Sequence, residues 1–376
     1  MKDLNLILKG IKYVCPCGTS GYAEAAKDYI IALYKYYKNI PLSVCHLKFD
    51  NSNCEGGKRN KTIKPLIDKK IKYNKLILHC TPEHWPKLIE KFGGKDIEII
   101  GMTVWETDKL HPDWVKWINL VDKVIVPCTW NKKVFINSGV TKPIEVIPHI
   151  YKSLPKIKCK IEGIEKGDFV FYTIGQWTER KGTADTIKVY LNTFTKKDKV
   201  CLIVKTFKDN YNEDQKEIIR QWVQNIIKQY SNPAKIILIT NELSDDQMAA
   251  LHHLGNVYFS LCKSEGFGLG MFDAAGLGNP VIGTNYGGQT DFLRLGLIDY
   301  KLIPVTEMEH IPWYLSEQNW AQPDLEQASQ LMKEFYKHYN TTMWFAEKQR
   351  DIIIKNFNMK SISNKLTYFL IKKNPK

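Results

Sequence analysis

Residues 264–273 (SEGFGLGMFD) carry two carboxylates and three glycines directly after a short apolar run. Glycines let a backbone approach a ligand closely, and the free N–H groups at the start of a helix favour an anion. Glu265 precedes the helix that we expect to begin near Leu269, and Asp273 lies about one turn inside it. Both carboxylates could therefore face one ligand, such as a pyrophosphate between a sugar and a ribose. A plain Gly-rich turn with Asp273 as a surface charge explains the spacing equally well.

Cationic side chains occur in the same half of the chain. Arg180 and Lys181 lie in residues 175–182 (GQWTERKG), and Lys205 ends the apolar run CLIVK. Departure of a nucleoside diphosphate builds negative charge on the leaving group, which fixed cations stabilise. A solvated surface pair is the more common role of adjacent Arg and Lys residues. A lone charge at the end of an apolar strand, as at Lys205, is less easily explained in that way.

Residues 264–288 (SEGFGLGMFDAAGLGNPVIGTNYGG) resemble the donor-site signature of family 4 glycosyltransferases, which have the GT-B fold. That signature has two glutamates separated by seven residues, a helix of small residues and a Pro-Val-Ile strand. Further segments resemble the family in the same order along the chain, namely 20–23, 101–126, 175–182, 202–205, 241–251 and 320–332. The resemblance implies an α/β protein with two doubly wound, Rossmann-like domains that face a central cleft, followed by C-terminal helices.

The resemblance also implies roles for individual residues. The catalytic residues would be Glu265, Lys181, Arg180 and Glu106, and the donor would be bound by Gly21, Tyr22, Lys205, Gly266, Phe267, Gly268, Leu269 and Asp273. Lys181 takes the position of the family's diphosphate-binding lysine. Gln176 stands where many relatives carry an arginine, and Arg180 could supply that guanidinium instead. Asp273 replaces a glutamate and is one methylene shorter, so we expect its contact with the ribose to be weaker or shifted.

Two loops in the first half of the chain carry the remaining candidates. Gly21 and Tyr22 follow the first predicted strand and could present N–H groups to a phosphate or to the acceptor, although a plain turn is the simpler interpretation. Glu106 could bond to a sugar hydroxyl or assist the acceptor, and could equally well cap a helix. His79 and His84 lack the spacing and the partners of a metal site. We therefore expect no metal and no cofactor.

The resemblance implies a retaining, metal-independent hexosyltransferase that moves a sugar from a UDP- or GDP-linked donor to a glycan, a lipid or a protein. In the family's front-face mechanism the leaving phosphate, held by Arg180, Lys181 and Lys205, accepts the proton of the acceptor hydroxyl. A GT-B sugar-nucleotide epimerase or hydrolase would share the donor site. A basic, non-enzymatic nucleic-acid-binding protein is an alternative from another class, but no RRM, KH or zinc motif supports it.

Composition limits the partners and the compartment. The chain of 376 residues has 54 Lys and Arg against 40 Asp and Glu, a formal charge of +14 that favours anionic partners, including a membrane face. A general drift toward Lys-rich composition explains this charge equally well. The nine cysteines form no C-x-x-C pair, which favours reduced thiols. With no signal peptide and no apolar membrane span, we expect a cytoplasmic protein, with peripheral membrane contact as one option.

Short β-branched runs alternate with amphipathic stretches, a pattern that predicts parallel sheets with crossover helices. The predicted strands are 5–14, 42–49, 75–79, 98–102, 123–127, 144–148, 169–174, 200–205, 235–239, 257–260 and 281–283. The predicted helices are 23–37, 184–194, 212–230, 244–254, 269–277 and, in the tail, 325–339 and 342–370. A polar stretch at 151–167 predicts domains 1–160 and 161–350, with residues 351–376 packing back toward the first domain. Residues 51–70 are expected to form a polar surface excursion.

Overall fold

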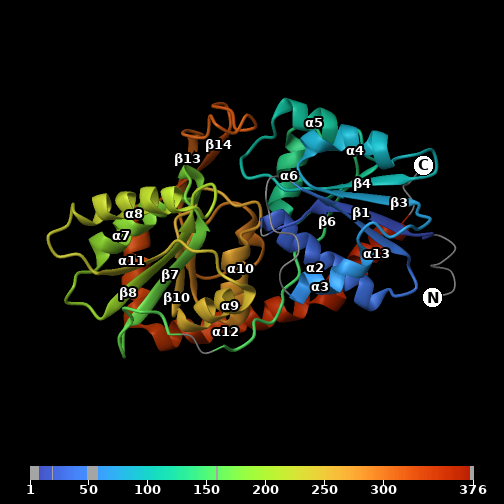
Figure 1. The fold of residues 1–376 in the computed structure, drawn as a ribbon. Coiled ribbons are helices and arrows are strands. Elements are labelled where there is room, and N and C mark those ends of the chain that lie inside the picture. Colours follow the sequence, from blue (N-terminus) through green and yellow to red (C-terminus); the bar gives the residue numbers. More distant parts are fainter. Residues whose placement is uncertain (1–7, 19, 49–57, 158–159, 373–376) are drawn as a thin grey trace. The chain divides into compact units, whose positions relative to one another are not determined.

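The computed structural model describes residues 8–18, 20–48, 58–157 and 160–372. The chain divides into two compact units (Figure 1). Unit 1 comprises Met1–Lys152 together with Lys355–Lys376, and unit 2 comprises Ser153–Ile354. The end of the chain therefore returns to the unit in which the chain begins.

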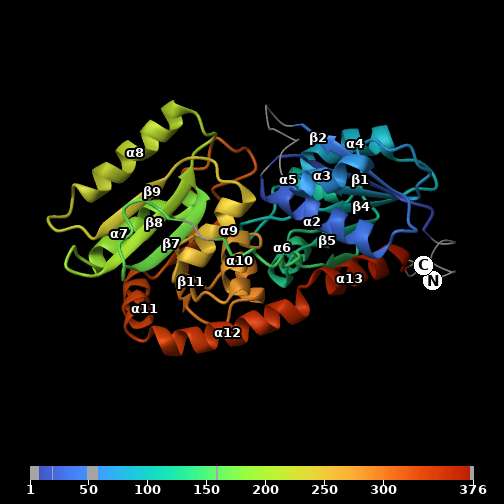
Figure 2. The same ribbon diagram turned by 60° about the horizontal axis from the view of Figure 1, so that its bottom comes forward.

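Unit 1 contains a parallel sheet with the strand order β2-β1-β3-β4-β5-β6. Its strands are β1 (Ile11–Pro16), β2 (Leu42–Leu47), β3 (Lys75–His79), β4 (Glu98–Met102), β5 (Lys123–Val126) and β6 (Ile144–Val146). One face is covered by α2 (Gly21–Tyr36), α3 (Lys58–Ile63), the 3-10 turn η1 (Lys64–Leu66) and α13 (Met359–Ile371) (Figure 2). The remaining helices are α4 (Trp85–Phe92), preceded by the turn η2 (Pro82–His84), α5 (Pro112–Ile118) and α6 (Thr129–Asn137).

Unit 2 contains a second parallel sheet with the order β12-β11-β10-β7-β8-β9. Its strands are β7 (Phe169–Gln176), β8 (Val200–Phe207), β9 (Lys235–Ile239), β10 (Val257–Ser260), β11 (Val281–Thr284) and β12 (Leu297–Ile298). The helices are α7 (Thr183–Thr193), α8 (Glu213–Ile227), α9 (Asp245–Leu254), α10 (Leu269–Leu277), α11 (Leu325–Lys337) and α12 (Tyr339–Asn356), with turns η3 (Glu179–Lys181) and η4 (Gly288–Asp291). An antiparallel hairpin, β13 (Tyr300–Pro304) and β14 (Asn319–Pro323), follows the sheet.

The α/β class with two doubly wound sheets is confirmed, and the strands predicted at 75–79, 98–102, 235–239 and 257–260 have the predicted bounds. Among the described residues the first strand begins at Ile11 and does not include residues 8–10, because its pairing with β2 starts at Ile11 and Leu42. Residues 5–7 of that prediction lie outside the described residues. The predicted excursion at 51–70 contains α3 and η1, and its residues 51–57 are likewise outside the described part. The β13–β14 hairpin and helices α4 and α6 were not predicted, whereas α5 lies within residues 101–126, where the family resemblance implied a helix.

A close contact between β4 and α4 shows how tightly the sheet of unit 1 is covered. A Cβ atom added at Gly101 would lie 2.2 Å from the Trp85 ring, and the Trp85 side chain is completely buried. The indole Nε1 of Trp85 donates a hydrogen bond to the Cys80 carbonyl at 3.2 Å, which fixes the ring in place. Only glycine fits at position 101 without displacing the helix.

We predict that Gly101→Ala lowers the free energy of unfolding by about 1–3 kcal/mol, the usual cost of overpacking a core. In a Trp85→Phe background the smaller ring leaves room for the methyl group, so the same substitution should cost less. Chemical unfolding of the four proteins of this cycle measures the difference. Gly94→Ala, where the nearest atom is a flexible Ile97 methyl at 3.3 Å, is the control. Equal losses in both backgrounds would contradict the assigned contact.

Two histidines are buried beneath α2 in unit 1. His79 Nδ1 lies 2.7 Å from the Tyr13 hydroxyl, and His149 Nδ1 lies 3.2 Å from the Tyr29 hydroxyl. Burial lowers the pKa of each imidazole to about 3, so both are neutral in the folded protein at neutral pH. On the outer side of α2, burial alone would raise the pKa of Glu24, but the charges of Arg59, Lys152 and Lys27 outweigh it and lower that pKa to about 2.

These values predict that unit 1 loses stability as the pH falls below about 6.5. In that range the unfolded chain protonates His79 and His149, whereas the folded protein does so only near pH 3. The unfolded state then binds more protons, so the free energy of unfolding decreases toward lower pH. Glu24 acts in the same direction, but only below its ordinary pKa of 4.5. Melting curves at pH 7 and pH 5 therefore isolate the histidines, and His79→Gln should reduce the difference while the exposed His310→Gln should not.

Candidate functional site

The candidate site in unit 2 lies where the strand order reverses. The chain passes from β7 through α7 to β8 on one side, and from β10 through α10 to β11 on the other. The strands β7 and β10 pair only at Phe171 and Tyr172, opposite Val257 and Tyr258. Beyond that point the Tyr258 hydroxyl donates to the carbonyl of Ile174 at 2.9 Å and accepts from its N–H at 3.3 Å. Ligands of open parallel sheets bind outside the carboxyl ends of the strands at such a reversal.

The loops that leave β7 and β10 are held against each other by backbone contacts and by one side-chain hydrogen bond. Gly182 adopts a left-handed conformation with φ of 59°, and a Cβ atom there would lie 2.2 Å from the Leu261 carbonyl oxygen. The Lys263 N–H donates to the Arg180 carbonyl at 2.7 Å. The Thr186 hydroxyl accepts from the Leu261 N–H at 3.1 Å. These contacts fix the position of the cations after β7 relative to the carboxylate after β10.

Glu265 forms ion pairs with both cations that the sequence analysis singled out. The Lys181 Nζ lies 2.5 Å from Glu265 Oε1, and Arg180 Nη1 lies 3.3 Å from Glu265 Oε2. Arg180 Nη1 also donates to the Ser264 carbonyl at 2.8 Å. The Glu265 and Arg180 side chains are each 13% exposed, and Lys181 is 21% exposed. The structure thus brings together three of the four predicted catalytic residues.

Burial and charge act in opposite directions on Glu265. Burial by itself raises the pKa of this carboxyl, but the neighbouring charges of Lys181 and Arg180 outweigh it and lower the pKa below its ordinary value. Glu265 is therefore an ionised hydrogen-bond acceptor. The cluster of Glu265, Arg180 and Lys181 offers a carboxylate that can accept bonds from hydroxyl groups, beside two cations that can bind phosphate oxygens.

A third loop, after β11, supports the Glu265 loop from behind. The Gly288 N–H donates to the Glu265 carbonyl at 2.7 Å. Cβ atoms at Gly287 and Gly288 would lie 2.6 Å from the Glu265 oxygen and 2.3 Å from the Gly266 oxygen. The double glycine was part of the family resemblance, but its supporting role could not be assigned from the sequence. It follows from the close approach of two backbones.

The remaining predicted donor-binding residues of this loop have different environments. Leu269 is the first residue of α10, and Gly268 precedes it as the N-cap in a left-handed conformation. No side chain caps the first N–H groups of the helix. Asp273 is half-buried in the second turn of α10. Phe267 is 3% exposed and packs against Phe272 and Phe292 at ring distances of 5.0 and 5.2 Å. Its side chain is thus a core group, so its predicted role in donor binding can belong only to its backbone.

Among the described residues, neither Lys205 nor Gln176 forms a hydrogen bond or an ion pair with Glu265, Arg180 or Lys181. The Lys205 ammonium lies 5.6 Å from the Phe207 ring centre and 5.0 Å from that of Tyr211. Burial lowers its pKa to about 8, although the charge of Glu242 acts in the opposite direction. Gln176 donates from Nε2 to the Lys208 carbonyl at 2.8 Å. The guanidinium beside Glu265 is therefore that of Arg180, and Gln176, at the position of the relatives' arginine, does not contact Glu265.

A buried ion pair that sequence reasoning missed braces this cluster. Lys263 pairs with Glu179, the residue before Arg180, and the Lys263 side chain is only 5% exposed. Its ammonium lies 5.5 Å from the ring centre of Trp320 on β14, and the Ala321 N–H donates to the Lys263 carbonyl at 2.9 Å. The pair links residues 84 positions apart in sequence. Its one sequence signal was a lysine two residues before Glu265.

In unit 1 the predicted residues Gly21 and Tyr22 lie at the start of α2, which follows β1. The strand order reverses there, since β1 has β2 on one side and β3 on the other. Gly21 is the first residue of α2 after the Ser20 cap. The Tyr22 hydroxyl lies 2.8 Å from the Thr103 hydroxyl and donates to the Val104 carbonyl at 3.2 Å. Burial raises the pKa of Tyr22, and the charge of the half-buried Glu106 raises it further. The charge of Glu106 therefore acts on Tyr22, and the roles of both residues stay predictions.

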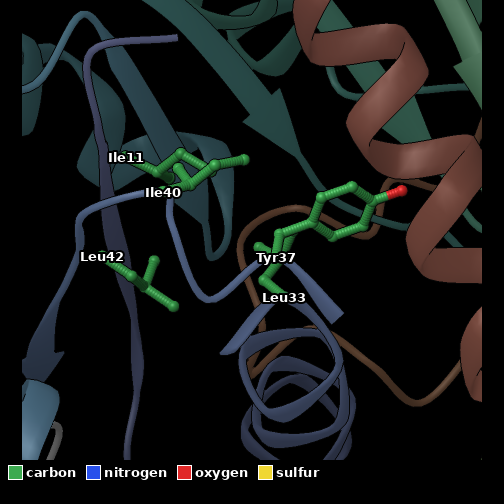
Figure 3. A pocket seen from close by; sticks show the side chains of 5 residues that line it. All are labelled: Ile11, Leu33, Tyr37, Ile40 and Leu42. Atoms are coloured by element: carbon green, nitrogen blue, oxygen red, sulfur yellow. The ribbon is translucent and has the colours of Figure 1, made fainter. Parts of the chain in front are cut away.

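Two recesses in unit 1 contain none of the predicted site residues. Figure 3 shows an apolar cavity lined by Ile11, Leu33, Tyr37, Ile40 and Leu42, with a volume of about 10 Å³. That is room for about one water molecule, so the cavity is a packing defect rather than a substrate site. An open recess of about 660 Å³ is lined by Asp108, Lys109, Leu110, Pro112, Val115, Asn137 and Ser138, beside the loop that carries Glu106.

Other expectations concern metals, thiols and membranes. Among the described residues, no group of three or more His, Cys, Asp or Glu side chains is arranged to hold a metal ion. Six described cysteines are free, but Cys17 is disulfide-bonded, so the prediction of uniformly reduced thiols is wrong at that position. A membrane-spanning helix is absent from the described part of the chain, since none of its helices combines sufficient length with sufficient apolar character.

The fold is that of the GT-B glycosyltransferases. A glucose- and UDP-bound structure of HepE from Anabaena is 13% identical and has a TM-score of 0.68, with 96% of this chain and 99% of that chain covered. Sucrose-phosphate synthase from Thermosynechococcus elongatus is 12% identical with a TM-score of 0.68, covering 96% and 98%. A glycosyltransferase from Rickettsia africae is 13% identical with a TM-score of 0.63, covering 97% and 99%. At these identities the likeness concerns the fold alone.

A family model matches a segment that lies mostly in unit 2. Residues 144–312 match the family model of the glycosyl transferases group 1. This segment contains the Glu265 cluster, and its match agrees with the family resemblance of the sequence. A comparison with curated proteins found no match.

We predict that Lys263→Met destabilises the protein by about 2 kcal/mol, less than the 3–5 kcal/mol typical of a broken buried pair, because Glu179 is 31% exposed. Adding Glu179→Gln should restore part of the loss, because the unpaired charge is then removed. Lys263→Arg should retain the pair. Chemical unfolding of the single and double variants measures the coupling. Strictly additive losses would contradict the brace.

Proposed function

We propose that the protein is a retaining glycosyltransferase that moves a sugar from a UDP- or GDP-linked donor to a glycan, lipid or protein acceptor. The observation that carries the proposal is the Glu265 cluster, a carboxylate ion-paired to Arg180 and Lys181 at the strand-order reversal of a group 1 glycosyltransferase domain. The acceptor class and contact with a membrane stay predictions of the sequence, as does the assignment to family 4.

In this proposal the donor diphosphate lies at the start of α10, between the helix and the two cations. The first N–H groups of α10 and the helix dipole favour an anion there. Arg180 and Lys181 stabilise the charge that develops on the leaving phosphate. Because these side chains are already held by Glu265 and by backbone contacts, little reorganisation is required when the charge appears.

Glu265 orients the donor sugar by accepting hydrogen bonds from its hydroxyl groups. Its lowered pKa keeps it in the accepting, ionised form. Asp273 holds the ribose from the second turn of α10. In a front-face reaction the leaving phosphate takes the proton of the acceptor hydroxyl as the new glycosidic bond forms on the face that the phosphate leaves. We infer that no metal is required, since the two cations provide the charge stabilisation.

Lys205 has a different part in this proposal from that of the two cluster cations. Its ammonium is packed over two aromatic rings at the end of β8, the neighbour of β7 in the sheet. We assign it to donor binding rather than to the departing phosphate. In unit 1, Gly21 and Tyr22 at the start of α2, and Glu106, whose charge acts on Tyr22, keep their predicted roles toward the donor and the acceptor.

We predict that Glu265→Gln and Lys181→Ala each lower turnover at least about 100-fold, the loss typical of removing one group that stabilises transition-state charge. The donor is first chosen as the UDP- or GDP-sugar that raises the melting temperature most. Release of the nucleoside diphosphate, as the sugar passes to water or to an added acceptor, then measures turnover. The exposed Glu213→Gln and Lys196→Ala are matched controls, and circular dichroism checks the fold. Near-normal turnover in either test variant would remove the site assignment.

Product analysis by NMR separates the proposal from its nearest alternative. Transfer with retention gives an acceptor product with the anomeric configuration of the donor, whereas an epimerase changes the donor itself and a hydrolase releases only free sugar. Turnover that persists in excess EDTA supports metal independence.

A further inference from the structure

The positive charge of the chain is concentrated in one unit. Met1–Lys152 together with Lys355–Lys376 contain 31 Lys and Arg against 15 Asp and Glu, whereas Ser153–Ile354 contains 23 against 25. The formal charge is thus +16 for unit 1 and −2 for unit 2. A general drift toward Lys-rich composition would affect both units alike, so it does not account for this division.

Within unit 1, one layer of helices carries exposed lysines without acidic partners. This basic layer consists of α2, α3, η1 and α13, which pack on the same core cluster over one face of the sheet (Figure 2). Its exposed lysines are Lys35 and Lys38 at the end of α2, Lys61, Lys64, Lys360 and Lys365. No ion pair joins any of them to another described residue. Residues 355–376 contain six lysines and no Asp or Glu.

The acidic residues of this layer are already neutralised. Glu24 and Asp28 on α2 are mostly buried and form ion pairs with Arg59 and Lys152, and Glu24 also pairs with Lys27 at 2.9 Å. The outer surface is therefore left with lysines.

Exposed tyrosines accompany these lysines. Tyr34 and Tyr36 on α2 are 44% and 38% exposed, and Tyr368 on α13 is 64% exposed. The Lys35 ammonium lies 5.3 Å from the Tyr36 ring centre. A side chain with an apolar ring and a polar hydroxyl is suited to the headgroup region of a bilayer, and lysines are attracted to anionic lipids. The helices α2 and α13 pack against each other, with the Tyr37 hydroxyl 2.8 Å from Asn364.

We propose that the basic layer docks unit 1 on an anionic phospholipid membrane. A membrane fits better than a nucleic acid because the layer's charge is carried by lysines. The one arginine in its described helices, Arg59, is bound to Glu24 and Asp28. Arginine provides the planar, bidentate recognition of phosphates and bases, whereas lysines act as point charges on a diffuse anionic surface. This surface is independent of sugar transfer, so its test needs no donor or acceptor.

The test is co-sedimentation of the full chain with vesicles of phosphatidylcholine alone and with 30% phosphatidylglycerol at physiological salt. We expect binding to the anionic vesicles only. The triple variant Lys61→Glu, Lys64→Glu, Lys365→Glu should bind at least about 100-fold more weakly, since each lysine near the surface contributes about fivefold. The matched control Lys196→Glu, Lys197→Glu, Lys333→Glu makes the same change of charge at exposed lysines of unit 2 and should retain binding.

Three outcomes would overturn the proposal. The first is equal binding to neutral and anionic vesicles, or binding to neither. The second is an equal loss in the two triple variants, which would indicate a response to net charge alone. The third is that random-sequence RNA displaces the protein from sedimented anionic vesicles more effectively than added anionic vesicles do, which would identify a nucleic-acid surface. Tyr34→Ser with Tyr368→Ser gives an independent check, because it should weaken the binding that remains at high salt, where the lysines are screened.

Discussion

One carboxylate held between two cations is the interaction on which the candidate site depends. Glu265 alone would be costly to bury as an anion, and the ion pairs with Arg180 and Lys181 make its ionised form favourable. The pairing requires that the loops after β7 and β10 approach closely, which explains why Gly182 has no room for a side chain. The double glycine at 287–288 lets the loop after β11 approach the Glu265 backbone closely. The Lys263–Glu179 pair joins the loops after β7 and β10.

The two units place their polar candidates by the same geometric rule. In each sheet the strand order reverses beside the first strand of the unit, β1 or β7, and the loops there open at the carboxyl ends. Unit 2 places Glu265 and the cations at this point, and unit 1 places Gly21, Tyr22 and Glu106 near it. Loops from strands that are far apart in sequence lie side by side at such a reversal. The reversal therefore determines which distant residues act together.

Charge in unit 1 is separated by depth. Beneath α2 the environment is dry enough to keep His79 and His149 neutral well below their ordinary pKa. On the outer side of the same helix, Glu24 and Asp28 form ion pairs with nearby cations, and the exposed lysines Lys35, Lys61, Lys360 and Lys365 face solvent. The interior and the outer surface thus follow from one rule, that an unpaired charge is stable only where water or a counter-charge can reach it.

The sequence by itself determined the α/β class, most strand positions and the segment that carries Glu265, because hydrophobic periodicity and glycine spacing are local properties of the chain. It also placed Arg180 and Lys181 in the same loop. Tertiary structure decided that Lys205 packs on aromatic rings, that Phe267 is a core residue and that Lys263 pairs with Glu179. The return of the acid-free C-terminal segment to unit 1 was predicted from the sequence, and the structure shows that it concentrates the charge there. These features join residues far apart in sequence, and the strand order that brings them together leaves no local pattern.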